Sequence, residues 1–356
     1  MKQSILSLFD IQYPIVQAGM AGGPATPELA AAVSNAGGLG TLGAGYMKPA
    51  DLQAAIKTIR ETTDKPYAVN LFLPEEFIED RVQTEKMQAL LAPFRSSLGI
   101  MDKATGKKEH QSTFQEQLQC VLDAQVPIVS FTFNAPSDEL VDLLKGYGVR
   151  IMATATSVKE AQKLEALGID AISAQGSEAG GHRGTFIGEA EDALIGTMAL
   201  IPLLTDAVSV PVIAAGGIMD GRGIAAAMAL GASGVQLGTA FLASAESGAH
   251  PLHKDAVLHA KETDLRLTKA FSGKMARGIN NDFMKQMAAV EDLPPYPILN
   301  AMTSEIRKKA ASEGKREWMS LWAGQGAPLA ESRPAREIMN RLLKEYNEVI
   351  SQMKPF

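Results

Sequence analysis

Short, almost continuous apolar runs alternate with segments of helical periodicity along most of the chain. A run that is apolar at consecutive positions is typical of a strand buried on both faces, as in a parallel sheet. Between the runs lie helix signals, such as Thr26 as an N-cap before Pro27 and Gly37 after the last turn. The pattern predicts strands at 13–18, 38–43, 67–72, 127–133, 150–155, 170–175, 211–217 and 234–240, and helices at 27–36, 49–63, 137–146, 157–167, 189–208 and 221–231.

Eight strands separated by helices predict a closed (β/α)8 TIM barrel, an α/β fold, with an open doubly wound sheet as the alternative. Two segments interrupt the alternation. Residues 75–111 read as a charged helical insertion, and residues 275–356 are rich in helix and contain the loop EDLPPYPILN. We therefore expect a barrel made of residues 1–74 and 112–274, and a smaller helical lid or domain with a C-terminal helix over residues 275–356. Exterior decoration or an oligomer contact is an equally compatible role for these segments.

The composition is that of a globular protein, with 46% hydrophobic and 21% charged residues in a chain of 356. A formal net charge of −6 gives no reason to expect nucleic acid or an anionic membrane surface as a partner. The longest apolar run, residues 193–204, is shorter than the roughly 18 residues of a membrane span, and the N-terminal segment is too polar for a signal peptide. We therefore expect a cytoplasmic protein. Cys120 is the only cysteine, which excludes an intrachain disulfide, and the spacing of the five histidines predicts no metal site.

Two glycine-containing turns follow the predicted seventh and eighth strands. Gly216 and Gly217 end one strand, and Gly238 and Thr239 end the next. In (β/α)8 barrels the loops after these two strands frequently bind phosphate, because their backbone N–H groups converge. The literal G-x-G-x-x-G match in GLGTLG, in contrast, follows a helix and lies within a strand, which is not the context of a dinucleotide site. The sequence therefore predicts a phosphorylated cofactor held by the two turns.

Polar side chains at other strand ends indicate a flavin. The first strand ends in Gln17–Met20, Asn70 lies in the third strand, and Gln175 ends the sixth. Asn and Gln amides supply both the donors and the acceptors that the pyrimidine edge of a flavin requires. Each amide alone is equally compatible with a satisfied position in the core. Met20 is placed to touch the ring.

His182 lies in the stretch AQGSEAGGHRG, residues 174–184, which contains four glycines. This loop follows the predicted sixth strand, at the same end of the barrel as the phosphate turns. Glycines allow the backbone to pass close to a ring system. We expect a catalytic or substrate-orienting role for His182; the alternative is a turn residue without chemistry.

Four stretches, in order, resemble the signature blocks of the nitronate monooxygenases, formerly called 2-nitropropane dioxygenases. They are PIVQAGMAGGPATPELAAAVSNAGGLGTLG, AQGSEAGGHRG, AAGGIMDGRGIAAAMALGASGVQLGTAFLAS and SGKMARGINN. The resemblance implies a TIM barrel that holds FMN beside a smaller helical domain, with His182 as the active-site histidine. Motifs and resemblance together give the expected FMN-binding residues Ala18, Gly19, Met20, Asn70, Gln175, Gly180, Gly181, Gly216, Gly217, Gln236, Leu237, Gly238 and Thr239.

The chain departs from the family pattern at Lys274, where the resemblance leads us to expect arginine. Lysine keeps the charge but lacks the planar fork that binds two oxygens at once, so we expect no bidentate phosphate or substrate contact at this position.

The resemblance implies oxidation of alkyl nitronates, with propionate 3-nitronate among the candidates, by FMN and O2 to a carbonyl compound and nitrite. Protonated His182 would hold the nitronate oxygens, whereas neutral His182 would remove the α-proton of a nitroalkane. One alternative is an FMN-dependent NAD(P)H enoyl-acyl-carrier-protein reductase, whose histidine block is of the same E-A-G-G-H kind. Another is a non-catalytic flavin-binding or interaction protein. The expected partners are small molecules, and a homo-oligomer is compatible with the sequence.

Overall fold

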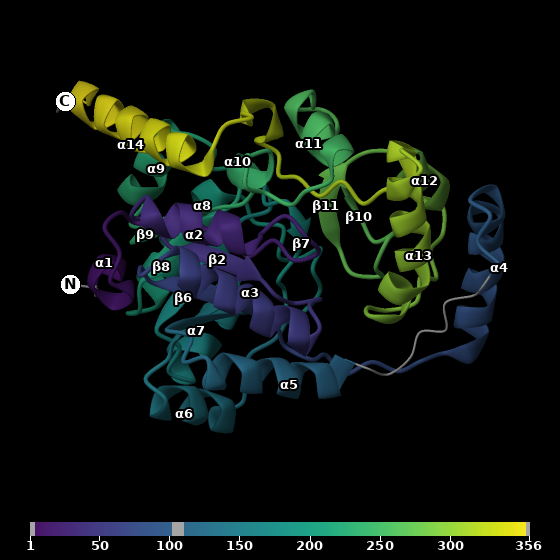
Figure 1. Cartoon of the computed structure of the whole chain (residues 1–356), viewed down its shortest axis with the longest axis horizontal. Helices are drawn as coiled ribbons and strands as arrows, with labels where there is room; N and C mark the ends of the chain where they lie inside the picture. The colour runs from purple at the N-terminus through teal and green to yellow at the C-terminus, as the bar shows by residue number, and fades with distance from the viewer. Residues whose placement is uncertain (1–3, 102–109, 354–356) are drawn as a thin grey trace.

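The computed structural model describes residues 4–101 and 110–353, so residues 102–109 of the predicted insertion lie outside the described part. Eight parallel strands form one sheet in the order β1-β9-β8-β6-β5-β4-β3-β2. A parallel bridge between Val16 and Leu39 joins the two ends of this order, which makes the sheet a nearly closed barrel. The predicted TIM-barrel fold is confirmed (Figure 1).

All eight predicted barrel strands are present close to their expected bounds. They are β1 (Ile15–Gln17), β2 (Gly40–Gly43), β3 (Tyr67–Phe72), β4 (Ile128–Thr132), β5 (Arg150–Ala155), β6 (Ala171–Gln175), β8 (Val212–Ala215) and β9 (Gly234–Leu237). The helices of the barrel and the short helix before it are α1 (Ile5–Phe9), α2 (Pro27–Asn35), α3 (Pro49–Thr62), α5 (His110–Asp123), α6 (Asp138–Gly146), α7 (Val158–Ala166), α8 (Thr197–Ala207), α9 (Gly221–Ala229) and α10 (Thr239–Leu242).

Short polar side chains begin several of these helices. Thr26 Oγ1 accepts a hydrogen bond from Leu29 N at 3.0 Å, and Asp220 accepts from the backbone of Gly223 at the start of α9. Two bounds differ from the prediction. The helix expected from residue 189 begins at Thr197, after Gly196, and residues 239–240 belong to α10 instead of a strand.

A second apolar cluster lies beside the barrel (Figure 1). It contains α4 (Arg81–Ser97), α11 (Pro251–Leu258), β10 (Leu265–Thr268), β11 (Ala276–Ile279), α12 (Asp282–Met287), α13 (Ile298–Ser312) and the short helices η1 (Arg316–Trp318) and η2 (Ala327–Leu329). The rings of Phe94 in α4 and Phe283 in α12 are 4.8 Å apart. Arg95 of α4 forms an ion pair with Glu305 of α13. We propose that this cluster is the smaller domain.

The segment from residue 275, expected to be helical, begins instead with strand β11. This strand pairs antiparallel with β10 and with β7 (Gly181–His182), so that Ala276 lies opposite His182. All four residues of β11 are buried, and the strand pairs with a neighbour on each side. The small sheet therefore carries His182 between the barrel and the second cluster.

The C-terminal helix α14 (Ala335–Gln352) packs back on the barrel (Figure 1). Its Ile338 and Leu342 are fully buried in the barrel core cluster. Glu345 Oε2 accepts a hydrogen bond from Gly221 N at the start of α9. No helix in the described part of the chain has the length and apolar content needed to cross a membrane.

Candidate active site

A cavity of about 790 Å³ lies at the carboxyl ends of the barrel strands. Every predicted site residue except Leu237 lines it. Leu237 is buried in the barrel core, where its carbonyl accepts a hydrogen bond from Ala18 N at 2.9 Å. The fold thus brings the residues selected from the sequence together in one cavity, while their binding roles remain predictions.

The two predicted phosphate turns lie on neighbouring strands, β8 and β9. Gly216 has a φ of 112° and Gly217 a φ of 74°, which are left-handed backbone conformations that favour glycine. On β9, Gly238 and Thr239 line the same cavity, and Thr239 Oγ1 accepts a hydrogen bond from Gly324 N at 2.9 Å. Two adjacent glycine turns without bulky side chains fit a phosphate group held by backbone N–H groups.

The centre of the barrel presents polar atoms that lack protein partners. Asn70 Nδ2 donates to Ser130 Oγ at 3.1 Å and to Thr132 Oγ1 at 3.2 Å, whereas Asn70 Oδ1 has no hydrogen-bond partner. Ser173 Oγ, which is also buried, has none either. Leaving a buried polar atom unpaired costs about 1–3 kcal/mol. Asn70 and Ser173 both line the cavity, and their unpaired oxygen atoms fit the polar edge of a flavin ring.

Two of the expected polar positions act within the protein itself. Gln17 does not line the cavity; its side-chain oxygen accepts a hydrogen bond from Thr41 N at 3.0 Å, so it is an amide of the core. Gln175 lines the cavity, but its Nε2 donates to the carbonyl of His182 at 3.0 Å and its Oε1 accepts from Gly184 N at 2.9 Å. Gln175 therefore holds the backbone of His182 in place.

The loop before His182 is packed too closely for larger residues. A Cβ atom at Gly180 would lie 2.4 Å from Gly324 N, which explains the glycine at this position. Arg183, 1% exposed, donates to the carbonyls of Gly176 and Ala193. The segment that carries the histidine is thus fixed from both sides.

The His182 ring lies among aromatic side chains. The ring centroids of Phe133 and Trp322 are 5.7 Å and 5.3 Å away, and His182 Nε2 is 2.8 Å from Ser272 Oγ. Burial, together with the positive charges of Lys274 and Arg307, lowers the pKa of His182 from 6.5 to about 3. The imidazole is therefore neutral at pH 7.

Sequence reasoning missed a cation in the same cavity. Arg307 of α13 lines it, and its Nη2 donates to the carbonyl and side-chain oxygens of Asn300, both at 2.8 Å. Among the described residues, no carboxylate forms an ion pair with Arg307, which leaves its charge available to an anion. On an amphipathic helix such an arginine has the same pattern as a surface residue, so nothing local distinguished it.

Two tyrosines near the cavity were also missed. Tyr46 and Tyr296 share a hydrogen bond in which Tyr296 donates and Tyr46 accepts, and loss of solvation raises the pKa of both phenols, so both are neutral. Tyr296 belongs to the proline-bearing loop noted in the sequence, and Tyr46 follows β2. The position of both tyrosines near the cavity depends on how the barrel and the second cluster pack together, which no local sequence pattern indicates.

Lys274, the departure from the family pattern, does not line the cavity. Its Nζ lies 2.6 Å from Glu75 Oε1 and 4.9 Å from the centre of the Phe133 ring. The lysine thus joins the loop after β10 to the segment after β3. The positive charge of Lys274 contributes to the lowered pKa of His182.

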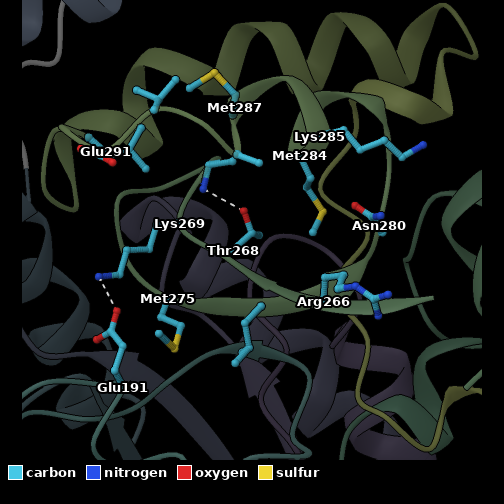
Figure 2. Close-up of a pocket in the computed structure, with 15 residues that line it drawn as sticks. Glu191, Arg266, Thr268, Lys269, Met275, Asn280, Met284, Lys285, Met287 and Glu291 are labelled. Carbon is cyan, nitrogen blue, oxygen red and sulfur yellow. Dashed lines mark hydrogen bonds and ion pairs between the residues drawn. The ribbon is translucent and has the colours of Figure 1, made fainter. Parts of the chain in front are cut away.

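A second cavity, of about 490 Å³, lies between β10, α12 and the residues after α12 (Figure 2). Met275, Met284 and Met287 line it, and an ion pair of 2.8 Å between Lys269 and Glu191 lies at one side. It contains none of the predicted site residues. The candidate active site is therefore the larger cavity.

Known proteins resemble the chain over nearly its whole length. Residues 2–345 match the nitronate monooxygenase family. A probable nitronate monooxygenase of Staphylococcus haemolyticus is 48% identical over 97% of both chains, and one of Staphylococcus aureus strain Newman is 47% identical over 98% of both.

Among solved structures, a nitroalkane oxidase from Streptomyces ansochromogenes is 39% identical, with a TM-score of 0.93 over 99% of this chain and 100% of that one. FabK from Thermotoga maritima is 34% identical, with a TM-score of 0.77 over 99% of this chain and 98% of that one. The agreement in sequence and in fold extends over nearly the whole chain, including the barrel and the second cluster. The chain therefore belongs to the nitronate monooxygenase family, and it is an oxidoreductase of oxidative nitronate and nitroalkane metabolism.

Proposed function

We propose that this chain binds FMN in the larger cavity and oxidises alkyl nitronates with O2 to a carbonyl compound and nitrite. FMN, when bound, supplies the oxidising chemistry that the side chains lack. The turns at Gly216–Gly217 and Gly238–Thr239 would hold its phosphate, and Asn70 and Ser173 would face the polar edge of the ring. The unpartnered atoms of Asn70 and Ser173 support this arrangement.

The position of His182 carries the chemical role, because its ring lines the cavity and its Nε2 is 2.8 Å from Ser272 Oγ. A protonated imidazole is disfavoured because burial and two nearby cations lower its pKa to about 3. Of the two roles left open by the sequence, the low pKa disfavours the protonated one. It also makes the imidazole a weaker base, so the base role rests on the position of His182 in the cavity. In this role neutral His182 removes the α-proton of a nitroalkane, and the nitronate that results is the species oxidised. A nitronate supplied directly needs no such step.

Arg307 supports a preference for anionic substrates. Its guanidinium lines the cavity without an ion-pair partner among the described residues, so it can balance either the nitronate or a carboxylate on the same molecule. We therefore propose carboxylated nitronates, such as propionate 3-nitronate, as substrates beside simple alkyl nitronates.

His182→Asn tests the proposal. The variant is expected to keep bound FMN and to lose at least about 100-fold in kcat with nitroethane, because a general base contributes roughly 10²- to 10⁴-fold. The measurement is nitrite release beside the FMN content of the purified protein. Unchanged turnover of nitroethane would reject His182 as the base.

An enoyl reductase remains the second candidate, supported by the likeness to FabK over nearly the whole chain. The higher TM-score of the nitroalkane oxidase, 0.93 against 0.77, favours the nitronate reaction. Reduction of the bound flavin by NADH without oxygen separates the two candidates.

A further inference from the structure

Ser272 is the one residue hydrogen-bonded to the ring of His182 in the described part of the chain. It lies in the loop between β10 and β11 and is 1% exposed. Its Oγ is 2.8 Å from His182 Nε2, donates to the carbonyl of Lys274 at 3.1 Å and accepts from Lys274 N at 3.3 Å.

A count of protons decides the direction of these bonds. A serine hydroxyl has one hydrogen to donate and two lone pairs to accept with. When Ser272 donates to the Lys274 carbonyl, it accepts from both Lys274 N–H and His182 Nε2–H, and all three of its positions are filled. If it donated to His182 Nε2 instead, the Lys274 carbonyl would lose the hydrogen bond that the structure gives it. The filled arrangement requires a proton on His182 Nε2.

The imidazole ring of His182 is also held in one orientation. Gln175 holds the His182 carbonyl, and Phe133 and Trp322 pack against the ring. The loop that carries Ser272 is itself fixed, because Thr303 Oγ1 donates to the carbonyl of Phe271. Since Nε2 is turned to Ser272, Nδ1 is the ring nitrogen of His182 left for a ligand in the cavity that the residue lines.

We propose that Ser272 is a positioning residue that keeps the proton of neutral His182 on Nε2 and leaves the lone pair on Nδ1, the atom that takes the α-proton of a nitroalkane. This inference rests on the proposed function. In the step, the Cα–H bond breaks, its electron pair forms the C=N bond of the nitronate, and the π pair of one N=O bond moves onto its oxygen, which takes the negative charge. The proton moves to His182 Nδ1, and Nε2–H continues to donate to Ser272.

The proposal makes Ser272 important for one substrate form only. A nitroalkane has an α-proton to lose, so it needs a correctly placed lone pair on His182. A nitronate has already lost that proton, so its oxidation needs no base. Ser272 therefore sets the ratio of nitroalkane to nitronate turnover.

The test combines spectroscopy and kinetics on the FMN-loaded enzyme. Ring ¹⁵N signals of histidine-labelled protein, with His182 assigned by its absence in His182→Asn, are expected to show a protonated Nε2 in the wild type and a loss of this single tautomer in Ser272→Ala. The ratio of kcat/KM for nitroethane to that for ethyl nitronate is expected to fall at least about ten-fold in Ser272→Ala, a part of the roughly 10²- to 10⁴-fold that a general base contributes. Ser272→Thr, which keeps the hydroxyl, is expected to restore most of that ratio.

Ser34→Ala is the matched control. Ser34 lies on the barrel and is also 1% exposed. Its hydroxyl donates to the carbonyl of Pro66 and accepts from Gly40 N. Ser34→Ala should leave the ratio unchanged. A wild-type ring protonated on Nδ1, or an equal loss with both substrates in Ser272→Ala, would overturn the proposal. An enzyme inert to both substrates would count against the proposed function instead, and the ¹⁵N spectrum would still decide the tautomer.

Discussion

At the scale of single residues, the chemistry of His182 depends on groups that are distant in sequence. Burial and the charges of Lys274 and Arg307 keep the imidazole neutral, and Ser272 binds its Nε2. The glycine-rich context indicated where a reactive histidine would lie. It did not indicate its protonation state, because that state depends on side chains from the second cluster.

Arg307→Met tests the role of the cavity cation. The variant is expected to raise KM for propionate 3-nitronate at least about ten-fold more than KM for ethyl nitronate, since a hydrogen bond to a charged group contributes roughly 1.5–3 kcal/mol. Steady-state nitrite assays with both substrates measure this difference. Arg336→Met, at an exposed position of α14, is the control and should change neither KM. An equal rise of KM for both nitronates would show that Arg307 does not recognise the carboxylate.

At the scale of elements, the turns after β8 and β9 lie where the sequence predicted them and line the cavity, while their role in binding phosphate stays a prediction. Both contain glycines at strand ends, and in a barrel the ends of neighbouring strands meet. The small sheet was missed, because β7 has only two residues and β10 reads LRLT, which is too short for a clear periodicity. Strand β7 pairs antiparallel with β11, which lies about a hundred residues later in the chain. No local sequence pattern reveals a pairing over that separation.

Gly216→Ala tests the phosphate turn. The φ of 112° at this position is unfavourable for alanine, and the added Cβ would lie 3.1 Å from Ala179 N and 3.2 Å from Thr197 Oγ1. We expect the Kd of the apoprotein for FMN, measured by fluorescence titration, to rise at least about ten-fold, which corresponds to roughly 1.4 kcal/mol.

Gly231→Ala is the matched control for this turn. Gly231 has a φ of 97° and a neighbour, Thr205 Oγ1, at 3.1 Å, but it lies between α9 and β9, at the opposite end of the strands. It should lower the free energy of unfolding and leave the Kd for FMN unchanged. The same Kd in Gly216→Ala and wild type would show that the phosphate of FMN does not bind at this turn.

At the scale of the whole molecule, the barrel and the second cluster meet around one cavity, and their junction holds two histidines whose pKa values are lowered. His253 is 7% exposed, donates from Nε2 to the carbonyl of Trp322, and has its pKa lowered from 6.5 to about 4, chiefly by burial. The barrel could be predicted from periodicity alone. This junction could not, because it depends on how the insertion and the C-terminal half pack together.

The buried histidines predict that stability falls with acidification. Between pH 6.5 and 4 the unfolded chain binds a proton at position 253 and the folded chain does not. The free energy of unfolding therefore decreases as pH falls through this range, by up to about 1.4 kcal/mol per pH unit for one group. Urea unfolding at pH 7, 6 and 5 should show a shallower decrease in His253→Gln than in the wild type. Equal slopes in the two proteins would contradict a neutral, buried His253.

The most direct test of the account is an anaerobic titration of the purified protein with ethyl nitronate, and in parallel with NADH, following the visible absorbance of the bound flavin. We expect a yellow protein whose absorbance is lost with ethyl nitronate and persists with NADH. Loss of the absorbance with NADH alone would contradict it in favour of the enoyl reductase, and a protein that binds no flavin would contradict the cofactor assignment itself.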